Sequence, residues 1–97
     1  MDLTITDATA ASRYEAHLDG ELAGVIDYIS KRGRIALVHT EVTPAFEGRG
    51  IASRLARHAL DDARRRGLIV IPLCPYVLAY LERHPEDRDL VRTARPR

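Results

Sequence analysis

The sequence predicts a mixed α/β protein of the α+β class, in which antiparallel strands precede a strand, helix and strand unit. Short segments of alternating apolar and polar residues, separated by turn residues, occupy the stretch up to residue 42. This pattern is typical of antiparallel hairpins. The hydrophobic period then changes to about 3.6 residues over 50–66, and a short apolar run follows. That order is typical of two parallel strands joined by a crossover helix.

Two hairpins are predicted in the first half of the chain. Residues 13–18 and 21–29 are expected to pair as antiparallel strands, because Asp19-Gly20 between them favours a type I′ turn. A second turn at 31–33 leads to a third strand at 34–42. Simple alternation places four residues of this strand on one face, namely Ile35, Leu37, His39 and Glu41. We expect the first half of the strand to be covered on both faces.

The clearest single element is a helix over 50–66. Its apolar residues form one stripe, namely Ile51, Ala52, Leu55, Ala56, Ala59, Leu60 and Ala63. The opposite side carries charged residues, which we interpret as a solvated face, namely Arg54, Arg57, Asp61, Asp62, Arg64 and Arg65. Gly67 suits a left-handed C-cap after a last turn rich in arginine.

Two short elements are expected after this helix. The run 68–71 has no alternation, which predicts a strand buried on both faces. Pro72 cannot donate a hydrogen bond to a neighbouring strand, so either a functional opening of the sheet or a bulge without function is expected there. Pro75 suits the first position of a short helix that ends before His84-Pro85.

Length and composition restrict the range of functions. The 97 residues suffice for one domain over 1–97, with 93–97 frayed. Fifteen basic and 14 acidic residues give a net charge of +1, so we expect no nucleic-acid partner. A single cysteine, the lack of a signal-peptide pattern and the lack of a long apolar run predict a cytoplasmic protein with no membrane role. We expect a monomer or a weak homodimer.

The junction from Val42 to Ser53 is the most informative segment. Gly48 and Gly50 permit a tight turn that exposes backbone N–H groups, and the helix that follows adds the positive end of its dipole. A phosphate-bearing ligand is therefore predicted here, with an ordinary turn before a helix as the alternative. A dinucleotide-binding turn is disfavoured because Ser53 replaces the third glycine, and a P-loop because no Gly-Lys-Ser or Gly-Lys-Thr follows.

These residues also carry a family resemblance. The segment Glu47-Gly48-Arg49-Gly50-Ile51-Ala52 is similar to the pyrophosphate-binding signature of the GNAT superfamily of acetyl-CoA-dependent N-acetyltransferases. Gly50 and Ala52 match that signature, whereas Glu47 stands where Gln or Arg is usual. Three further motifs extend the resemblance to a short GNAT-like family over 13–91, namely His39-Thr40-Glu41-Val42, Cys74-Pro75-Tyr76 and Arg83-His84-Pro85-Glu86.

The resemblance implies a GNAT-like fold that binds acetyl-CoA or CoA and transfers acetyl to a primary amine of a small molecule or a protein. In such folds the two parallel strands splay apart and the pantetheine arm enters the gap, which Pro72 fits. Larger relatives add further helices and strands around the acceptor, so the acceptor side is expected to be open. The expected coenzyme-binding residues are Val42, Gly48, Arg49, Gly50, Ile51, Ala52, Ser53 and Tyr80. No metal ion is expected.

Three residues are the main candidates for catalysis, and Tyr80 is a further candidate for the leaving-group step. His39 or Glu41 is interpreted as the general base for the acceptor amine, with a hydrogen-bonded core histidine as the alternative for His39. Cys74 precedes a helix N-terminus, which favours the thiolate. It is interpreted as a relay for the acetyl group, a mixed-disulfide partner of CoA, or a buried residue that lines the site. Tyr80 is expected to protonate the departing thiolate or to pack against pantetheine. The alternative function is a CoA-binding or protein-interaction module without transferase activity.

Overall fold

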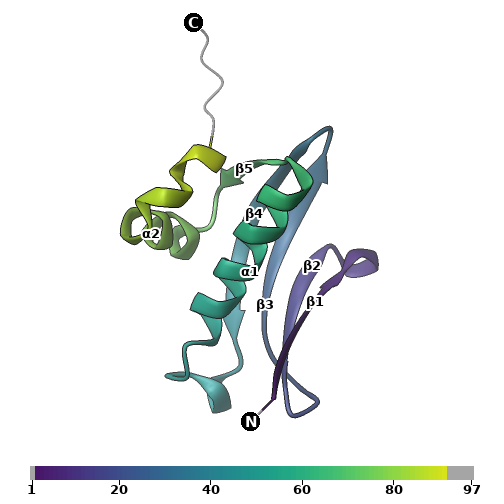
Figure 1. Ribbon diagram of the computed structural model, residues 1–97. Helices are drawn as coiled ribbons and strands as arrows, with labels where there is room; N and C mark the ends of the chain where they lie inside the picture. Colours follow the sequence, from purple (N-terminus) through teal and green to yellow (C-terminus); the bar gives the residue numbers. More distant parts are fainter. Residues whose placement is uncertain (1, 92–97) are drawn as a thin grey trace, which may run out of the picture.

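The fold is one five-stranded sheet with two α-helices (Figure 1). The computed structural model describes residues 2–91, so the frayed end expected at 93–97 lies outside the described residues. The strands are β1 (Leu3–Ala8), β2 (Arg13–Leu18), β3 (Glu21–Lys31), β4 (Arg34–Val42) and β5 (Ile69–Pro72), and they lie in this order in the sheet. The helices are α1 (Ile51–Arg66) and α2 (Pro75–Arg83). Within the described part of the chain, no helix is both long and apolar enough to span a bilayer.

The two predicted hairpins are confirmed, and β1 is an additional strand that the sequence reading missed. Asp19 and Gly20 have φ of 50° and 89°, as a type I′ turn requires. The second turn is shorter than expected, because Lys31 still belongs to β3 and only Arg32 and Gly33 connect the strands. The strand β1 pairs antiparallel with β2, so the sheet begins before the first predicted hairpin.

The predicted strand, helix and strand unit is confirmed. Strand β5 pairs parallel with β4, and α1 connects them. The helix ends at Gly67, which has φ of 68° and donates its N–H to the last-turn carbonyls of Ala63 and Arg64. The apolar stripe of α1 is buried against the sheet, except that Ala52 is only partly buried. The 3.6-residue period of the apolar residues therefore correctly predicted which side of α1 packs on the sheet.

Both helices pack on the same face of the sheet, which we call the covered face (Figure 1). Its fully buried sheet residues include Tyr14, Ala16, Ile26, Ile35, Leu37 and Val70. We call the other side the open face, because no helix of residues 2–91 packs on it. The expectation that β5 and the first half of β4 are buried on both faces is wrong. Ala36, Ile69 and Ile71 alternate onto the open face and keep part of their surface exposed.

The charged side of α1 is more than a solvated face. Asp87, in the 3-10 helix η3 (Pro85–Leu90), is 3% exposed. Its carboxylate accepts hydrogen bonds from both terminal nitrogens of Arg57, at 2.6 and 2.9 Å. Arg64 donates in the same way to Asp89, at 2.9 and 2.8 Å. The Arg57 hydrogen bonds outweigh burial and hold the pKa of Asp87 below its ordinary value. These paired charges fasten the end of the described chain to α1.

A second buried carboxylate, Asp62, joins α1 to the sheet and was wrongly assigned to the solvated side. It is 7% exposed. Its Oδ2 accepts hydrogen bonds from the Tyr14 hydroxyl at 2.7 Å and from Arg66 at 3.0 Å, and its Oδ1 accepts one from Arg65. Burial alone would raise the pKa of Asp62, but these hydrogen bonds and charges lower it. The same burial and the bond to Asp62 raise the pKa of Tyr14.

Candidate functional site

The glycine loop before α1 has the backbone conformation that the sequence predicts. Gly48 and Gly50 have φ of 85° and 74°, which L-residues rarely adopt. A Cβ atom at either position would meet nothing within 4 Å, so the positive φ rather than crowding requires glycine. Gly50 is the N-cap and has no side chain to satisfy the first amides of the helix. The N–H groups at the start of α1 therefore remain available to an anion.

The loop forms one wall of a hollow of about 290 Å³. Six of the eight predicted coenzyme-binding residues line it, namely Val42, Gly48, Gly50, Ile51, Ala52 and Ser53. Phe46, Glu47 and Tyr76 complete the lining, and sequence reasoning did not assign these three to the site. Arg49 lies within the loop, between the two glycines, and its guanidinium carbon is 5.7 Å from the centroid of the Phe46 ring. Tyr76 belongs to the Cys74-Pro75-Tyr76 motif of the family resemblance, and this motif could have placed it at the site.

Tyr80 lies elsewhere. Its residue is 2% exposed, and its ring stacks on His84 with centroids 3.9 Å apart and planes 14° apart. The guanidinium carbon of Arg57 lies 5.9 Å from the centroid of the Tyr80 ring. Tyr80 therefore packs among α1, α2 and the chain after α2. Tyr76, one helical turn earlier, is the tyrosine that lines the hollow.

The ladder between the two parallel strands ends beside this hollow. Pairing of β4 with β5 runs from Arg34 with Ile69 to Leu37 with Pro72. The carbonyl oxygen of Leu37 then accepts hydrogen bonds from the next two amides, those of Leu73 at 3.0 Å and Cys74 at 2.9 Å. Strand β4 continues to Val42 without a backbone partner on that side among the described residues. A gap thus opens between the end of β4 and the start of α2.

Cys74 lies at this gap but is almost fully enclosed. It is 3% exposed, and its Sγ lies 3.2 Å from Oγ1 of Thr40 on β4. The residue also caps α2, with Pro75 as the first helical residue. The contact between Thr40 and Cys74 links the two sides of the gap on the covered face.

His39 and Glu41 lie on the open face, which corrects the predicted alternation of β4. The register with β3 shifts at Val38, because Tyr28 pairs with Leu37 whereas Asp27 pairs with His39. One extra residue reverses every side chain beyond it. His39 and Glu41 therefore share a face with each other, with Nε2 to Oε1 at 3.3 Å, but not with Leu37. Their side chains are 57% and 71% exposed. The structure does not bring them to the same face as Cys74.

The fold and the site define an acetyltransferase-like class of α/β domain, with a glycine loop before a helix and a diverging pair of parallel strands. Residues 13–90 match the model of the GCN5-related N-acetyl-transferase family. The chain belongs to this family.

Curated relatives agree with this assignment. Protein NATD1 of Mus musculus is 39% identical over 66 residues, which cover 68% of this chain and 59% of NATD1. A streptothricin acetyltransferase of Streptomyces lavendulae is 38% identical over 63 residues, which cover 63% of this chain and 33% of that enzyme. The chain thus spans about three fifths of NATD1 and one third of the streptothricin enzyme.

Solved structures share the fold. A GCN5-like protein from Staphylococcus aureus has a TM-score of 0.71 at 20% identity, and the match covers 96% of this chain and 91% of that one. A GNAT family acetyltransferase from Brucella melitensis, solved in complex with acetyl-CoA, has a TM-score of 0.61 at 28% identity. That match covers 79% of this chain and 55% of the Brucella chain.

Proposed function

We propose that this protein binds acetyl-CoA and transfers its acetyl group to a primary amine. The observation that carries the proposal is the hollow between the glycine loop and α2, which adjoins the gap where β4 and β5 part. Membership of the GCN5-related family supports it, as does the likeness to a neighbour solved with acetyl-CoA. The streptothricin acetyltransferase relative supports an acetyl-transfer reaction, and the family description supports nitrogen as the acceptor atom.

The coenzyme contacts follow from backbone geometry more than from side chains. The amides at the start of α1 suit the pyrophosphate, because several unpaired N–H groups and the helix dipole point at one place. The free backbone edge of β4 beyond Leu37 suits the amide groups of the pantetheine arm. The proposed contacts are Val42, Gly48, Arg49, Gly50, Ile51, Ala52, Ser53 and Tyr76. The buried, stacked ring of Tyr80 favours a structural contact over the predicted role at the thiol.

The acceptor amine would approach from the open face. In the reaction the amine nitrogen forms a bond to the acetyl carbonyl carbon, the carbon–sulfur bond breaks, and the CoA thiolate takes up a proton from water. The amine loses a proton in exchange, which requires a base. His39 and Glu41 are adjacent, exposed and on this face, so either can accept that proton. The thiol of Cys74 is enclosed and contacts Thr40, which favours a lining role over an acetyl relay.

Binding is tested by placing a negative charge in the hollow. Ser53→Asp adds a carboxylate at the first turn of α1, where it stabilises the helix but repels a phosphate. We expect calorimetry to show acetyl-CoA affinity lowered by at least about tenfold, because like charges would meet at the amides. Ser30→Asp, the same change on an exposed residue of β3, is the matched control and should bind as the wild type does. Equal affinity for the two variants, or no binding to the wild type at millimolar coenzyme, would contradict the proposal.

Transfer is tested separately by following acetylated amines with labelled acetyl-CoA. Loss of turnover in His39→Ala or Glu41→Gln, with coenzyme binding retained, identifies the base. Turnover in Cys74→Ala excludes the covalent relay. Turnover that survives all three changes would remove the catalytic assignment.

A second candidate function is coenzyme binding without transfer. The burial of both Cys74 and Tyr80 favours it, because neither side chain is exposed to react with a substrate. Retained binding with no acetylated product would support this candidate. We further propose that the protein works in a reducing compartment, because its one cysteine is buried as a free thiol.

A further inference from the structure

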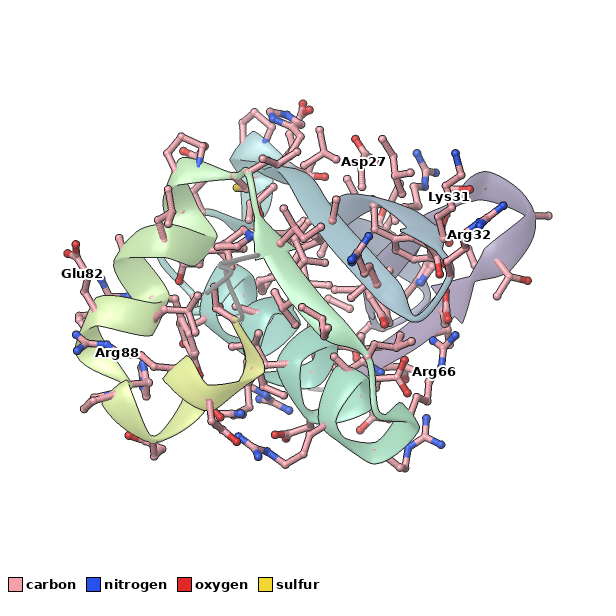
Figure 2. All side chains as sticks on the ribbon, turned by 90° about the horizontal axis from the view of Figure 1, so that it is seen from above. Asp27, Lys31, Arg32, Arg66, Glu82 and Arg88 are labelled. Carbon is pink, nitrogen blue, oxygen red and sulfur yellow. The ribbon has the colours of Figure 1, made fainter. Side chains whose placement is uncertain are left out.

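The open face carries three successive rows of side chains, each defined by strand register. The first row holds Asp27 and its cross-strand neighbour His39. The second holds Ile29, Ala36 and Ile71, and the third holds Lys31 and Arg34 beside the turn. Figure 2 shows Asp27 and Lys31 on the side of the sheet away from α1. The surface therefore changes from acidic to apolar to cationic along the direction of β3.

A hollow of about 440 Å³ lies over the second and third rows. Its apolar floor is formed by Ile29, Ala36 and Ile71, and its rim by Lys31, Arg32 and Arg34. Ile29 is 60% exposed and lies two residues before the end of β3, beside the other apolar residues of this floor. A floor of this kind suits an aliphatic or extended segment, and the rim determines the charge that such a segment carries.

The rim cations have no side-chain partner within residues 2–91. Four of the five arginines of α1 differ, because each of them contacts a carboxylate, namely Arg57, Arg64, Arg65 and Arg66. Three unneutralised cations around one hollow produce a positive potential that attracts anionic groups. The occupant that complements this rim is acidic.

The opposite end of the open face suits an amine. Glu41 and Asp27 are carboxylates on this face, and Glu41 contacts His39 at 3.3 Å. This is also the end proposed to hold the reacting amine. Two rows of a strand are about 7 Å apart, so the cationic rim lies about 13 Å from the His39 row. An extended peptide covers that distance in about four residues.

We propose that the amine acceptor is a peptide in which acidic residues lie about four positions from the acetylated amine. The peptide lies along the open face, with the amine at His39 and Glu41, its apolar part over Ile29, and its acidic residues at Lys31, Arg32 and Arg34. This inference rests on the proposed function, and it adds the class of acceptor.

The test uses short peptides with one lysine, flanked about four positions away by aspartate, by arginine or by serine. Acetylation with acetyl-CoA is followed by mass spectrometry, and binding without coenzyme by fluorescence anisotropy. We expect the acidic peptide to be acetylated with about tenfold higher kcat/KM than the basic one, as two or three exposed ion pairs would give. The preference should reside in KM and should decrease at high salt.

Charge reversal at the rim identifies the surface. Arg34→Glu should abolish the preference, whereas Arg83→Glu, at an exposed arginine of α2 outside the open face, should keep it. Equal acetylation of the three peptides, or a preference that survives Arg34→Glu, would overturn the inference while transfer itself stands. Acidic-peptide binding that is lost in Arg34→Glu, with no acetylation, would retain the docking surface and remove the transfer reaction. A dimer of this chain that Arg34→Glu dissociates would show a second copy as the occupant and overturn the proposal.

Discussion

The two faces of the sheet differ in how their charges and apolar residues are satisfied. On the covered face, Asp62 joins α1 to the sheet and accepts several hydrogen bonds, and the apolar residues are enclosed by two helices. Behind α1, the buried carboxylate of Asp87 likewise accepts two hydrogen bonds from Arg57. On the open face, Ile29 is largely exposed and Arg34 has no side-chain partner among the described residues. The difference indicates that stability is concentrated on one face, whereas the other face is free to contact ligands.

Strand β4 contributes to both faces because of its bulge. Leu37 before Val38 belongs to the core, and His39 after it belongs to the open face. Without the extra residue, His39 and Glu41 would face α1, and two charged or polar groups would be buried at considerable cost. The bulge therefore permits a hydrophobic strand to present a candidate base to solvent.

The largest expected effect comes from a pair of identical substitutions on the two faces of β3. Ile26→Ala removes a fully buried side chain on the covered face and should lower the free energy of unfolding by about 2–5 kcal/mol. Ile29→Ala, at a 60% exposed side chain on the open face, should change it by less than about 1 kcal/mol. Urea denaturation measures both. Similar losses in the two variants would show that the open face is covered in solution.

A medium effect is expected for the buried carboxylate that holds η3. Asp87→Asn weakens two charge-assisted bonds from Arg57 and should cost about 1–3 kcal/mol of unfolding free energy. Asp61→Asn, at an exposed carboxylate that also pairs with Arg57, should cost less than about 0.5 kcal/mol.

The pH dependence of this effect has a definite sign. The pKa of Asp87 is lowered in the folded protein, chiefly by hydrogen bonds from Arg57. Its contribution is therefore complete above the unfolded value, about 3.9, and is lost as the pH falls through the lower folded value. Unfolding measured from about pH 5 downward should show a smaller loss of stability in Asp87→Asn than in the wild type. Parallel acid profiles would contradict the assigned role of the Arg57 contact.

The smallest change in stability is expected at the glycine turns. Two variants there should differ in acetyl-CoA affinity but not in the free energy of unfolding. Gly48→Ala and Gly20→Ala both place a Cβ at φ near 85–89° with no atom within 4 Å, so each should cost about 1 kcal/mol of unfolding free energy. Only Gly48→Ala should weaken acetyl-CoA binding, by about tenfold, because it redirects the amides at the start of α1. Equal coenzyme affinity of the two variants would show that the hollow beside Gly48 is not the coenzyme-binding site.

Much of the fold was predictable because local signals agreed. The type I′ turn at Asp19-Gly20, the stripe of α1 and the cap at Gly67 each follow from short-range chemistry, and each is confirmed. Strand β1 was missed although Leu3 and Ile5 alternate with threonines, because no short turn signal marks the connection through which it pairs with β2. The buried state of Asp62 was also missed, since its partner Tyr14 is 48 residues away in the sequence.

The candidate site was predictable where backbone conformation determines it and less so where register does. Glycines at 48 and 50 are required by positive φ, which the sequence reveals directly. The face of His39 depends on a one-residue bulge at Val38, and the position of Tyr80 depends on stacking with His84. Neither depends on a repeating pattern, so alternation and helical spacing did not predict them.

The carbonyl of Leu37 also marks the point at which the opening beside the hollow begins. Its oxygen holds the amides of both Leu73 and Cys74, so its two lone pairs are occupied and the β-ladder terminates there. The chain must turn into α2 at this point instead of continuing alongside β4. One residue added between Pro72 and Cys74 would shift these two hydrogen bonds. The spacing between β4 and α2 would then change, while the core stayed intact.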